Sequence, residues 1–358
     1  MGLGWRRLAT LAAAAGLLLA GCAGGAASPV PSGEPQSPVS TAAPASPTPA
    51  LTKVAIAYDV GGRGGGGFND LAYEGALRAA TELGAQLKEI TAKPSDTDAD
   101  REERLALLAD VGYNPVIGVG YTYAGPMAKV AARYPDTWFG IVDDGTVTAP
   151  NVTGILFTEE QGSFLVGVAA ALKSKTGNVG FVGAVPVPLI QKFEAGFTAG
   201  ARAVNPDIKV QVAYLSQPPD FAGFNDPAKG KEAALGMYDA GADVVFAAAG
   251  GSGVGVIGAA KQQGRWAIGV DADEYRTSDP SIRDAVLTSM LKRADAGTYA
   301  FVRNVADGTA TGGNDVFDLA RDGVGYATSG GFIDDITDDI DAYAAKITSG
   351  AIVVPTTP

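Results

Sequence analysis

The sequence predicts an α/β protein with two lobes, each a doubly wound parallel sheet. From Lys53 onward, short apolar strands alternate with helices of about ten or more residues, which is the pattern of parallel strands joined by right-handed crossovers. The strands read as continuous apolar runs, as expected of sheets that are covered on both faces. The alternation occurs twice, and 358 residues are enough for two ordinary domains.

The first unit, Lys53–Gly84, contains the features expected of a ligand-binding turn. Its apolar strand ends in Asp59 and leads into a glycine-rich loop, which is followed by Phe68, Asn69 and a helix predicted from about Asp70. Asn69 or Asp70 is expected to cap this helix. The glycines let the backbone approach a ligand closely, and ligands of open α/β sheets bind beyond the carboxyl ends of the strands. We therefore expect this loop, with the ring of Phe68, to face a cleft.

The remaining elements follow in two runs. The predicted strands are Val54–Tyr58, Val116–Gly120, Trp138–Val142 and Val152–Phe157, then Asn178–Val182, Ile208–Tyr214, Asp243–Ala248 and Trp266–Val270. The predicted helices are Asp98–Ala109, Ala124–Arg133, Gln161–Lys173, Ile190–Val204, Pro227–Asp239 and Val254–Gln263. A strand (Ala285–Met290), a helix (Ala294–Asp307), a β-like stretch (Val316–Thr328) and a helix (Asp335–Ser349) are expected to cross back and complete both domains. One lobe then comprises 53–156 with about 292–320, and the other 157–291 with about 321–358.

Composition argues against several functions. The formal net charge is −12 and the sequence pI about 4.5, which disfavours nucleic acid or an anionic membrane surface as a partner. The chain has no histidine, the commonest general base and metal ligand, and Cys22 is its only cysteine. A catalytic triad, a zinc site and a disulfide framework are therefore not expected.

The amino terminus reads as an export signal. Arg6 and Arg7 precede an apolar run, Leu8–Ala20, which has the length of a signal h-region and is too short for a membrane-spanning helix. It ends in Leu19-Ala20-Gly21-Cys22, which resembles the bacterial lipobox, so residues 1–21 are predicted to be a lipoprotein signal peptide and Cys22 the lipidated first residue. The alternative is an ordinary secretory signal with an incidental cysteine.

Residues 22–52 are predicted to be a disordered tether, partly in the polyproline II conformation. Ala23–Thr52 is rich in Pro, Ser, Ala and Thr, and Glu34 is its only charged residue, so it cannot bury a core. No other segment is long and apolar enough to cross a bilayer. We therefore expect a protein that is lipid-anchored on the extracytoplasmic face of the cell membrane and does not span it.

Five segments of the folded part carry a family resemblance. They are the opening D-V-G-G…F-N-D-x-A-x-E-G, F-N-D-P-A-K-G-K (Phe224–Lys231), A-A-A-G-G-S-G-V-G-V (Ala247–Val256), A-I-G-V-D-A-D (Ala267–Asp273) and T-S-M-L-K-R (Thr288–Arg293). Each motif alone is weak, but five in order over Lys53–Gly350 are specific. Together with the lipobox, they resemble the basic membrane protein family of ABC-transporter substrate-binding lipoproteins, of the purine nucleoside receptor type.

The resemblance implies a two-lobed type I periplasmic-binding-protein fold with a hinged cleft. It also implies that a purine nucleoside binds in the cleft and is delivered to a membrane permease that has cytoplasmic ATPases. One departure is that Gly64–Gly67 replaces the polar residues that usually precede the F-N pair in the family. A looser loop is therefore expected here.

By the same resemblance, Phe68 and Phe224 sandwich the base; we place Phe224 rather than Phe221 at the second aromatic position because it directly precedes N-D-P-A-K. Stacking on an aromatic face contributes about 1–3 kcal/mol per base. The alternative is that each ring packs inside its own lobe. Asn69 has the donor and acceptor to bind a purine edge, or it caps the helix.

Asp59, Asp143 and Asp271 each end a predicted strand, where an α/β sheet presents groups to a ligand. A carboxylate that accepts from two ribose hydroxyls is selective, because a substrate lacking them leaves it buried and unpaired. The resemblance assigns all three to the ligand, together with Lys292, which either donates to the ribose or holds Asp271. The alternatives are solvated strand-end acids and a surface lysine beside Arg293.

Gly253–Gly258 matches GxGxxG, with Asp271 eighteen residues after Gly253, which is the context of a dinucleotide-binding loop. This is the main support for an alternative, a dinucleotide-dependent enzyme. The motif lies late in the chain, however, no residues resemble a hydride-transfer site, and dinucleotides are scarce outside the cytoplasmic membrane. The alternative explanation is that the glycines allow close strand–helix packing, and the family resemblance places the Gly253 backbone at the ligand.

The sequence thus predicts a monomeric, non-enzymatic binding protein for a neutral nucleoside, with no cofactor, no metal and no nucleic-acid partner. It is expected to act by hinge closure and to deliver its ligand to an ABC importer. The main alternative is a sensor lipoprotein that binds a small sugar or a nucleoside and reports to a receptor instead.

Overall fold

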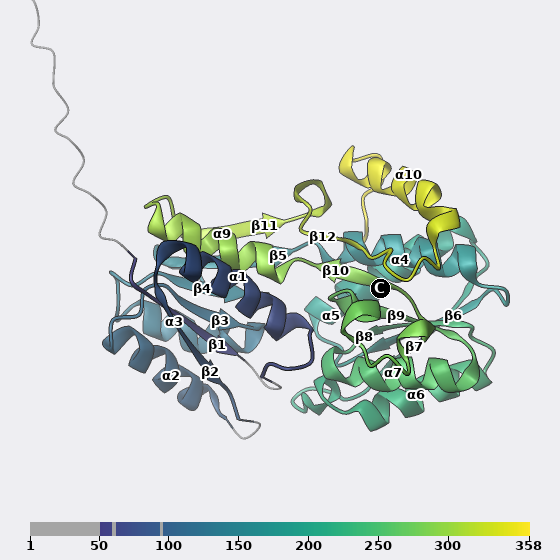
Figure 1. Ribbon diagram of the computed structural model, residues 1–358, viewed down its shortest axis with the longest axis horizontal. Coiled ribbons are helices and arrows are strands. Elements are labelled where there is room, and N and C mark those ends of the chain that lie inside the picture. Colours follow the sequence, from purple (N-terminus) through teal and green to yellow (C-terminus); the bar gives the residue numbers. More distant parts are fainter. Residues whose placement is uncertain (1–50, 59–61, 94–95) are drawn as a thin grey trace, which may run out of the picture. The chain divides into compact units, whose positions relative to one another are not determined.

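In the part of the chain that the structure describes, residues 51–58, 62–93 and 96–358, the computed structural model has two six-stranded sheets with helices on both faces of each (Figure 1). The sequence prediction of two α/β lobes with parallel sheets is therefore confirmed. Asp59, Cys22, the predicted signal peptide and nearly all of the predicted tether lie outside the described residues.

The first sheet has the order β11-β5-β4-β3-β1-β2, and all its neighbouring strands are parallel. Its strands are β1 (Lys53–Tyr58), β2 (Gln86–Thr91), β3 (Val116–Val119), β4 (Phe139–Val142), β5 (Val152–Phe157) and β11 (Gly313–Phe317). Its helices are α1 (Phe68–Leu83), α2 (Asp98–Asp110), α3 (Ala124–Ala131) and α9 (Ala294–Ala306). Helix α1 packs beside α9, and α2 packs beside α3.

The second sheet has the order β12-β10-β9-β8-β6-β7, in which only the edge strand β12 is antiparallel to its neighbour. Its strands are β6 (Asn178–Gly183), β7 (Lys209–Tyr214), β8 (Val244–Ala248), β9 (Trp266–Asp271), β10 (Val286–Lys292) and β12 (Val324–Tyr326). Its helices are α4 (Glu159–Lys173), α5 (Pro188–Val204), α6 (Pro227–Asp239), α7 (Gly253–Gln263), α8 (Glu274–Thr277) and α10 (Thr337–Thr348).

The chain passes between the lobes three times: from β5 to α4, from β10 to α9, and from β11 to β12. Segments from the last third of the chain therefore complete both sheets, and three backbone connections link the lobes rather than one. Such a link permits a hinge but restricts other movements of one lobe against the other.

Close helix packing depends on small residues. In the contact of α4 with α5, a β-carbon added at Gly196 would lie 2.1 Å from the Glu160 carbonyl oxygen, and one added at Gly200 would lie 2.0 Å from the Phe164 carbonyl oxygen. Only glycine fits at these two positions. Beneath these helices the rings of Phe181, Phe197 and Phe246 pack together and fill the core of the second lobe.

Some predicted elements were wrong. The stretch Val316–Thr328, predicted as one β-like segment, contains the end of β11 and the whole of β12, which belong to different sheets. Strand β2 was not predicted because its sequence, QLKEIT, is polar; it is an edge strand with mostly exposed side chains, so it needs no continuous apolar run. The short helix α8 was also missed.

The start of α1 also differs from the prediction. The helix begins at Phe68 with Gly67 as its N-cap residue, not at about Asp70, and no side chain caps it. Asn69 and Asp70 lie in the first turn, and their side chains bind the preceding loop instead.

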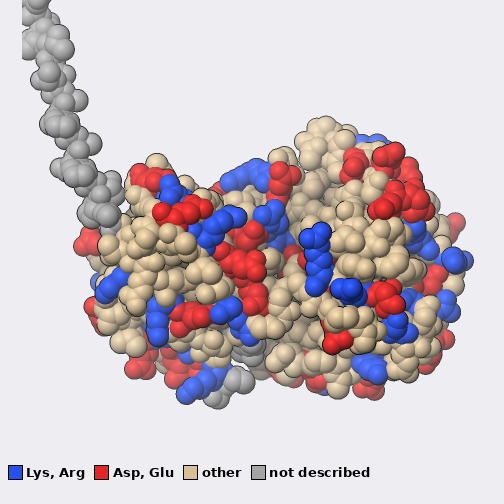
Figure 2. Space-filling view, viewed as in Figure 1, with Lys and Arg blue, Asp and Glu red and all other residues tan. Residues whose placement is uncertain are grey.

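The surface carries mixed charge on the face that Figure 2 shows, where acidic side chains gather over α10 and basic ones are scattered. Asp338, Asp339 and Asp341 belong to that helix. Among the described residues, no helix combines the length and the apolar character that crossing a bilayer requires.

Candidate functional site

A cavity of about 340 Å³ lies between the lobes. Its size is within the range of small-molecule sites. The first lobe contributes the loop before α1, the start of α1 and the segments after β3 and β4; the second contributes the ends of β8, β9 and β10 and the start of α5. These are mostly carboxyl ends of parallel strands, where a ligand site was expected.

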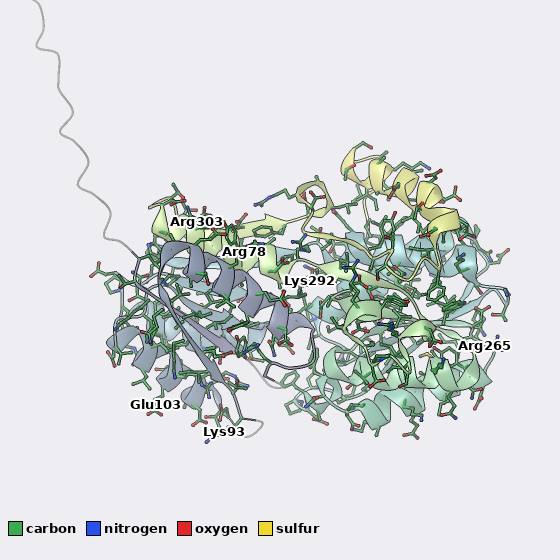
Figure 3. All side chains as sticks on the ribbon, in the orientation of Figure 1. Arg78, Lys93, Glu103, Arg265, Lys292 and Arg303 are labelled. Atoms are coloured by element: carbon green, nitrogen blue, oxygen red, sulfur yellow. The ribbon has the colours of Figure 1, made fainter. Side chains whose placement is uncertain are left out.

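Lys292 is the most deeply buried charge at this cavity. It is the last residue of β10, lies between the two lobes (Figure 3) and is 2% exposed. Its Nζ donates to Asp143 Oδ2 at 2.6 Å and lies 3.1 Å from Glu159 Oε1. The other oxygen of Glu159 accepts from Lys192 Nζ at 3.1 Å. These contacts form a row of alternating charges, from Asp143 through Lys292 and Glu159 to Lys192, that joins the lobes beside two of the three crossovers.

Burial and these partners shift the pKa values in opposite ways. Burial disfavours the charged lysine, but the carboxylates of Asp143, Glu159 and Asp271 outweigh it, so the pKa of Lys292 is raised. Burial raises the pKa of Asp143 to about 7, although Lys292 opposes the rise. Asp143 Oδ1 has no hydrogen-bond partner among the described residues. It is therefore an acceptor that a ligand donor would satisfy.

Asp143 and Asp271 hold corresponding positions in the two lobes. Asp143 directly follows β4 and Asp271 ends β9, and both strands are third in their sheets. Both residues adopt the left-handed backbone conformation, with φ of 71° and 64°. Both line the cavity, and burial raises the pKa of Asp271 to about 6. A carboxylate from each lobe thus faces one space.

Aromatic rings line the same cavity. The centroid of the Phe68 ring lies 4.9 Å from Lys292 Nζ. Phe224 and Phe221 both line the cavity from the second lobe, so the structure does not select between them. Phe224 is half-buried and packs against the core, whereas Phe221 is more exposed and meets Tyr121 of the first lobe edge to face, with ring centroids 6.2 Å apart.

The glycine-rich loop is held by the first turn of α1. Asn69 Nδ2 donates to the Gly62 carbonyl at 2.8 Å, and the Asp70 carboxylate accepts from the amides of Gly64 and Gly66. Gly66 has φ of 68°, and a β-carbon there would lie 2.9 Å from the β-carbon of Thr277 in the second lobe. The loop therefore reaches across to the other lobe, and a side chain at Gly66 would obstruct that approach.

The glycines of the GxGxxG match have different environments. Gly255 faces α6, where a β-carbon would lie 1.9 Å from the Pro227 carbonyl oxygen, so this glycine allows close helix packing. A β-carbon at Gly258 would meet nothing within 4 Å. Gly253 begins α7 and is not among the cavity-lining residues, although nearby Gly251 and Val254 are.

The structure brings most predicted site residues together: the cavity is lined by Phe68, Asn69, Asp143, Phe224, Asp271 and Lys292. Sequence reasoning missed Glu159, Tyr121 and Glu274. Glu159 begins α4 directly after a strand, and its burial beside Lys292 was not visible from spacing. Tyr121 follows β3, so the strand-end rule that selected Asp143 would have found it.

Glu274 lies three residues beyond Asp271, on the unpredicted helix α8. The described residues contain no group of three or more His, Cys, Asp or Glu placed to hold a metal ion. What the site offers instead is flat apolar faces beside buried acceptors and one buried cation, which suits reversible binding of a small polar molecule with an aromatic ring.

Comparison with known proteins gives a consistent result. Residues 52–358 match the Bmp family, described as ABC transporter substrate-binding protein PnrA-like. The CD4+ T-cell-stimulating antigen of Listeria monocytogenes is 35% identical over 321 residues, which cover 85% of this chain and 88% of that protein. The ABC transporter nucleoside-binding protein BmpA of Lactococcus lactis is 32% identical over 324 residues, covering 85% and 89%.

Among solved structures, an ABC transporter solute-binding protein from Aeropyrum pernix has a TM-score of 0.72 and 28% identity, and the match covers 85% of this chain and 94% of that one. The family match and this neighbour are solute-binding proteins rather than enzymes.

Proposed function

Because the chain belongs to the Bmp family of PnrA-like ABC transporter substrate-binding proteins, we propose that it captures a purine nucleoside in the interlobe cavity and delivers it to an ABC importer. The nucleoside-binding protein of Lactococcus lactis supports this ligand class by its similarity. The observation that carries the proposal is the joint lining of one cavity by aromatic rings and by strand-end carboxylates from both lobes.

The two kinds of lining group match the two parts of a nucleoside. The rings of Phe68 and Phe224 or Phe221 offer faces on which a base stacks, an interaction worth about 1–3 kcal/mol per base. Asp143 and Asp271 offer buried acceptors to the ribose hydroxyls, and Lys292 orients Asp143. A free base would lack the hydroxyls and leave these acceptors unpaired, which costs affinity.

The proposed mechanism is closure of the two lobes about the three crossovers. A ligand that contacts Asp143 in one lobe and Asp271 in the other stabilises the closed form by its higher affinity for that form. The permease then distinguishes loaded from empty protein by shape. Attachment through a lipid at Cys22 would keep the protein beside the permease; it is proposed from the lipobox-like sequence before that cysteine.

The test is calorimetry of residues 53–358 with adenosine, guanosine, inosine, uridine and ribose, preceded by mass spectrometry of any small molecule that co-purifies. We expect stoichiometric binding of a purine nucleoside. Phe68→Ala should weaken it by about 5- to 150-fold, the equivalent of one lost stacking face. Tyr299→Ala is the matched control, since Tyr299 lies on α9 and does not line the cavity.

Two results would contradict the proposal. Binding of ribose with no binding of any nucleoside would leave the fold intact and reject the ligand class. Stoichiometric binding of NAD(P), or turnover of any ligand, would favour the dinucleotide-dependent enzyme.

The variants Phe221→Ala and Phe224→Ala, measured side by side, identify which ring of the second lobe contacts the base. The variant that removes the contacting ring should show the larger loss of affinity.

A further inference from the structure

Glu274 is a half-buried acid of the cavity, with a buried carboxyl oxygen, that the proposed function does not yet use. It is the first residue of α8, three positions after Asp271, and it lines the cavity. Its Oε2 is inaccessible to solvent and has no hydrogen-bond partner among the described residues. A polar atom that is buried and unpartnered in an unliganded site requires an explanation.

The chain forms a niche for this side chain. A β-carbon at Gly269 on β9 would lie 2.6 Å from Glu274 Oε2, and one at Gly253 would lie 3.8 Å from Oε1. The Glu274 backbone amide donates to Ser289 Oγ on β10 at 3.0 Å, which fixes the start of α8 against the sheet. The carboxyl group is therefore positioned by three neighbouring elements and is not a mobile surface acid.

The charges around the niche are acidic or already paired. On β9 the neighbour is Asp271, whose charge opposes a charge on Glu274. On β10 the cation is Lys292, which binds Asp143 and Glu159.

The other charged groups near α8 also have partners. In the turn after α8, Arg283 lies over the Tyr275 ring and Asp284 binds Lys261 of α7. Directly before α8, Asp273 pairs with Arg276 of that helix and accepts a hydrogen bond from Ser329 Oγ. No lysine or arginine among the described residues forms an ion pair with Glu274, and a buried carboxylate without a cation favours its neutral form.

We propose that Glu274 binds the ligand as a neutral carboxylic acid and donates a hydrogen bond that the carboxylates of Asp143 and Asp271 cannot supply. The proposal rests on the nucleoside function above and deepens it: the ligand must present an acceptor atom at this side of the cavity. A neutral acid is both donor and acceptor, whereas an ionised carboxylate only accepts.

The pKa values support this division of roles. Burial, with the charge of Asp271, raises the pKa of Glu274 to about 8 although a hydrogen bond with the Val270 backbone opposes the rise, whereas the pKa values of Asp143 and Asp271 are about 7 and about 6. Near neutral pH Glu274 is therefore largely protonated and Asp271 largely ionised, while Asp143, beside Lys292, is about half ionised. Affinity should fall on the acid side as the acceptors gain protons and on the alkaline side as Glu274 loses its proton, which gives a bell-shaped profile.

The experiment is calorimetry from about pH 5 to about pH 9.5, with whichever of adenosine, guanosine and inosine binds near neutral pH. With a pKa of about 8, the protonated fraction of Glu274 falls about tenfold from pH 7 to pH 9, so the wild-type dissociation constant should rise about tenfold. Glu274→Gln keeps a donor that cannot ionise. Its affinity near pH 7 should stay within about threefold of wild type, and only its alkaline loss should disappear.

Two further variants complete the design. Glu274→Leu removes the donor and should bind about tenfold more weakly near pH 7 with no alkaline loss. Glu232→Gln removes one negative charge from the exposed surface of α6 and should reproduce the wild-type profile. Because each comparison uses the same ligand, any titration of the ligand itself cancels between variants.

The outcomes separate the two proposals. If nucleosides bind but the alkaline loss persists unchanged in Glu274→Gln, or Glu274→Leu binds as well as wild type near neutral pH, Glu274 is only structural and this inference is refuted. If no nucleoside binds the wild-type protein at any pH, the proposed function fails and this inference fails with it.

Discussion

Replacing Lys292 by methionine should destabilise the protein far more than replacing a surface lysine. The substitution keeps most of the side-chain volume but removes the cation from Asp143 and Glu159, whose side chains are 5% and 1% exposed. Removing one partner of a buried ion pair costs about 3–5 kcal/mol, because the remaining charge is buried and unpaired. With a urea m value of about 3 kcal/mol/M, the unfolding midpoint should fall by at least about 1 M.

The assay is urea unfolding of the ligand-free protein, followed by circular dichroism. Lys261→Met is the matched control: Lys261 pairs with Asp284 at 2.6 Å, but both side chains are about half exposed, and little change is expected. Near pH 5 the loss in Lys292→Met should shrink, since the stranded carboxylates can take up protons. Equal midpoints for the two variants near pH 7.5 would refute the assignment of a stabilising buried cluster.

Three further predictions concern other parts of the fold. Gly255→Ala should destabilise the protein by about 1–3 kcal/mol, because the added methyl group overlaps the α6 backbone. Gly258→Ala, with open space around it, should stabilise the protein by up to about 1 kcal/mol. Thermal melting compares the two variants directly, and equal melting temperatures would disprove the packing explanation. Asp70→Ala should release the amides of Gly64 and Gly66, so that limited proteolysis cuts this loop faster while the rest of the chain stays resistant; an unchanged cleavage rate would show that these bonds do not order the loop. Finally, the stability of the ligand-free protein should fall as pH rises from about 4.3 to about 8, because the folded protein keeps the Glu274 proton after the unfolded chain has released it. Glu274→Gln should flatten this part of the profile of melting temperature against pH. An unchanged slope would contradict the raised pKa of Glu274.

The sequence predicted those features that follow from local patterns. Apolar runs identified the buried strands because a parallel sheet covered on both faces tolerates few polar residues. The rule that ligands meet strand ends selected Asp143 and Asp271, and both line the cavity. The segment around Val316–Thr328 failed for a related reason, since two short strands in succession give no signal that they belong to different sheets.

What the sequence could not predict depends on contacts between distant segments. The ion pairs of Lys292 with Asp143 and Glu159 join residues more than one hundred positions apart. Glu274 follows a strand end by three residues, and only the niche at Gly269 shows that its carboxyl group is buried. Asn69 and Asp70 had the right residue types for a helix cap, but the glycine loop offered their side chains closer partners.

The matched positions of Asp143 and Asp271 have a consequence for how the protein is built. Each lies at the third strand of its sheet, in the same left-handed backbone conformation, so the lobes behave as an internal duplication that presents one architecture twice. In a two-fold symmetric dimer, a central site takes half of its groups from each identical subunit. This chain has the single-polypeptide counterpart of that arrangement, and because the two halves are covalently joined, their sequences are free to diverge until each suits a different end of an asymmetric molecule.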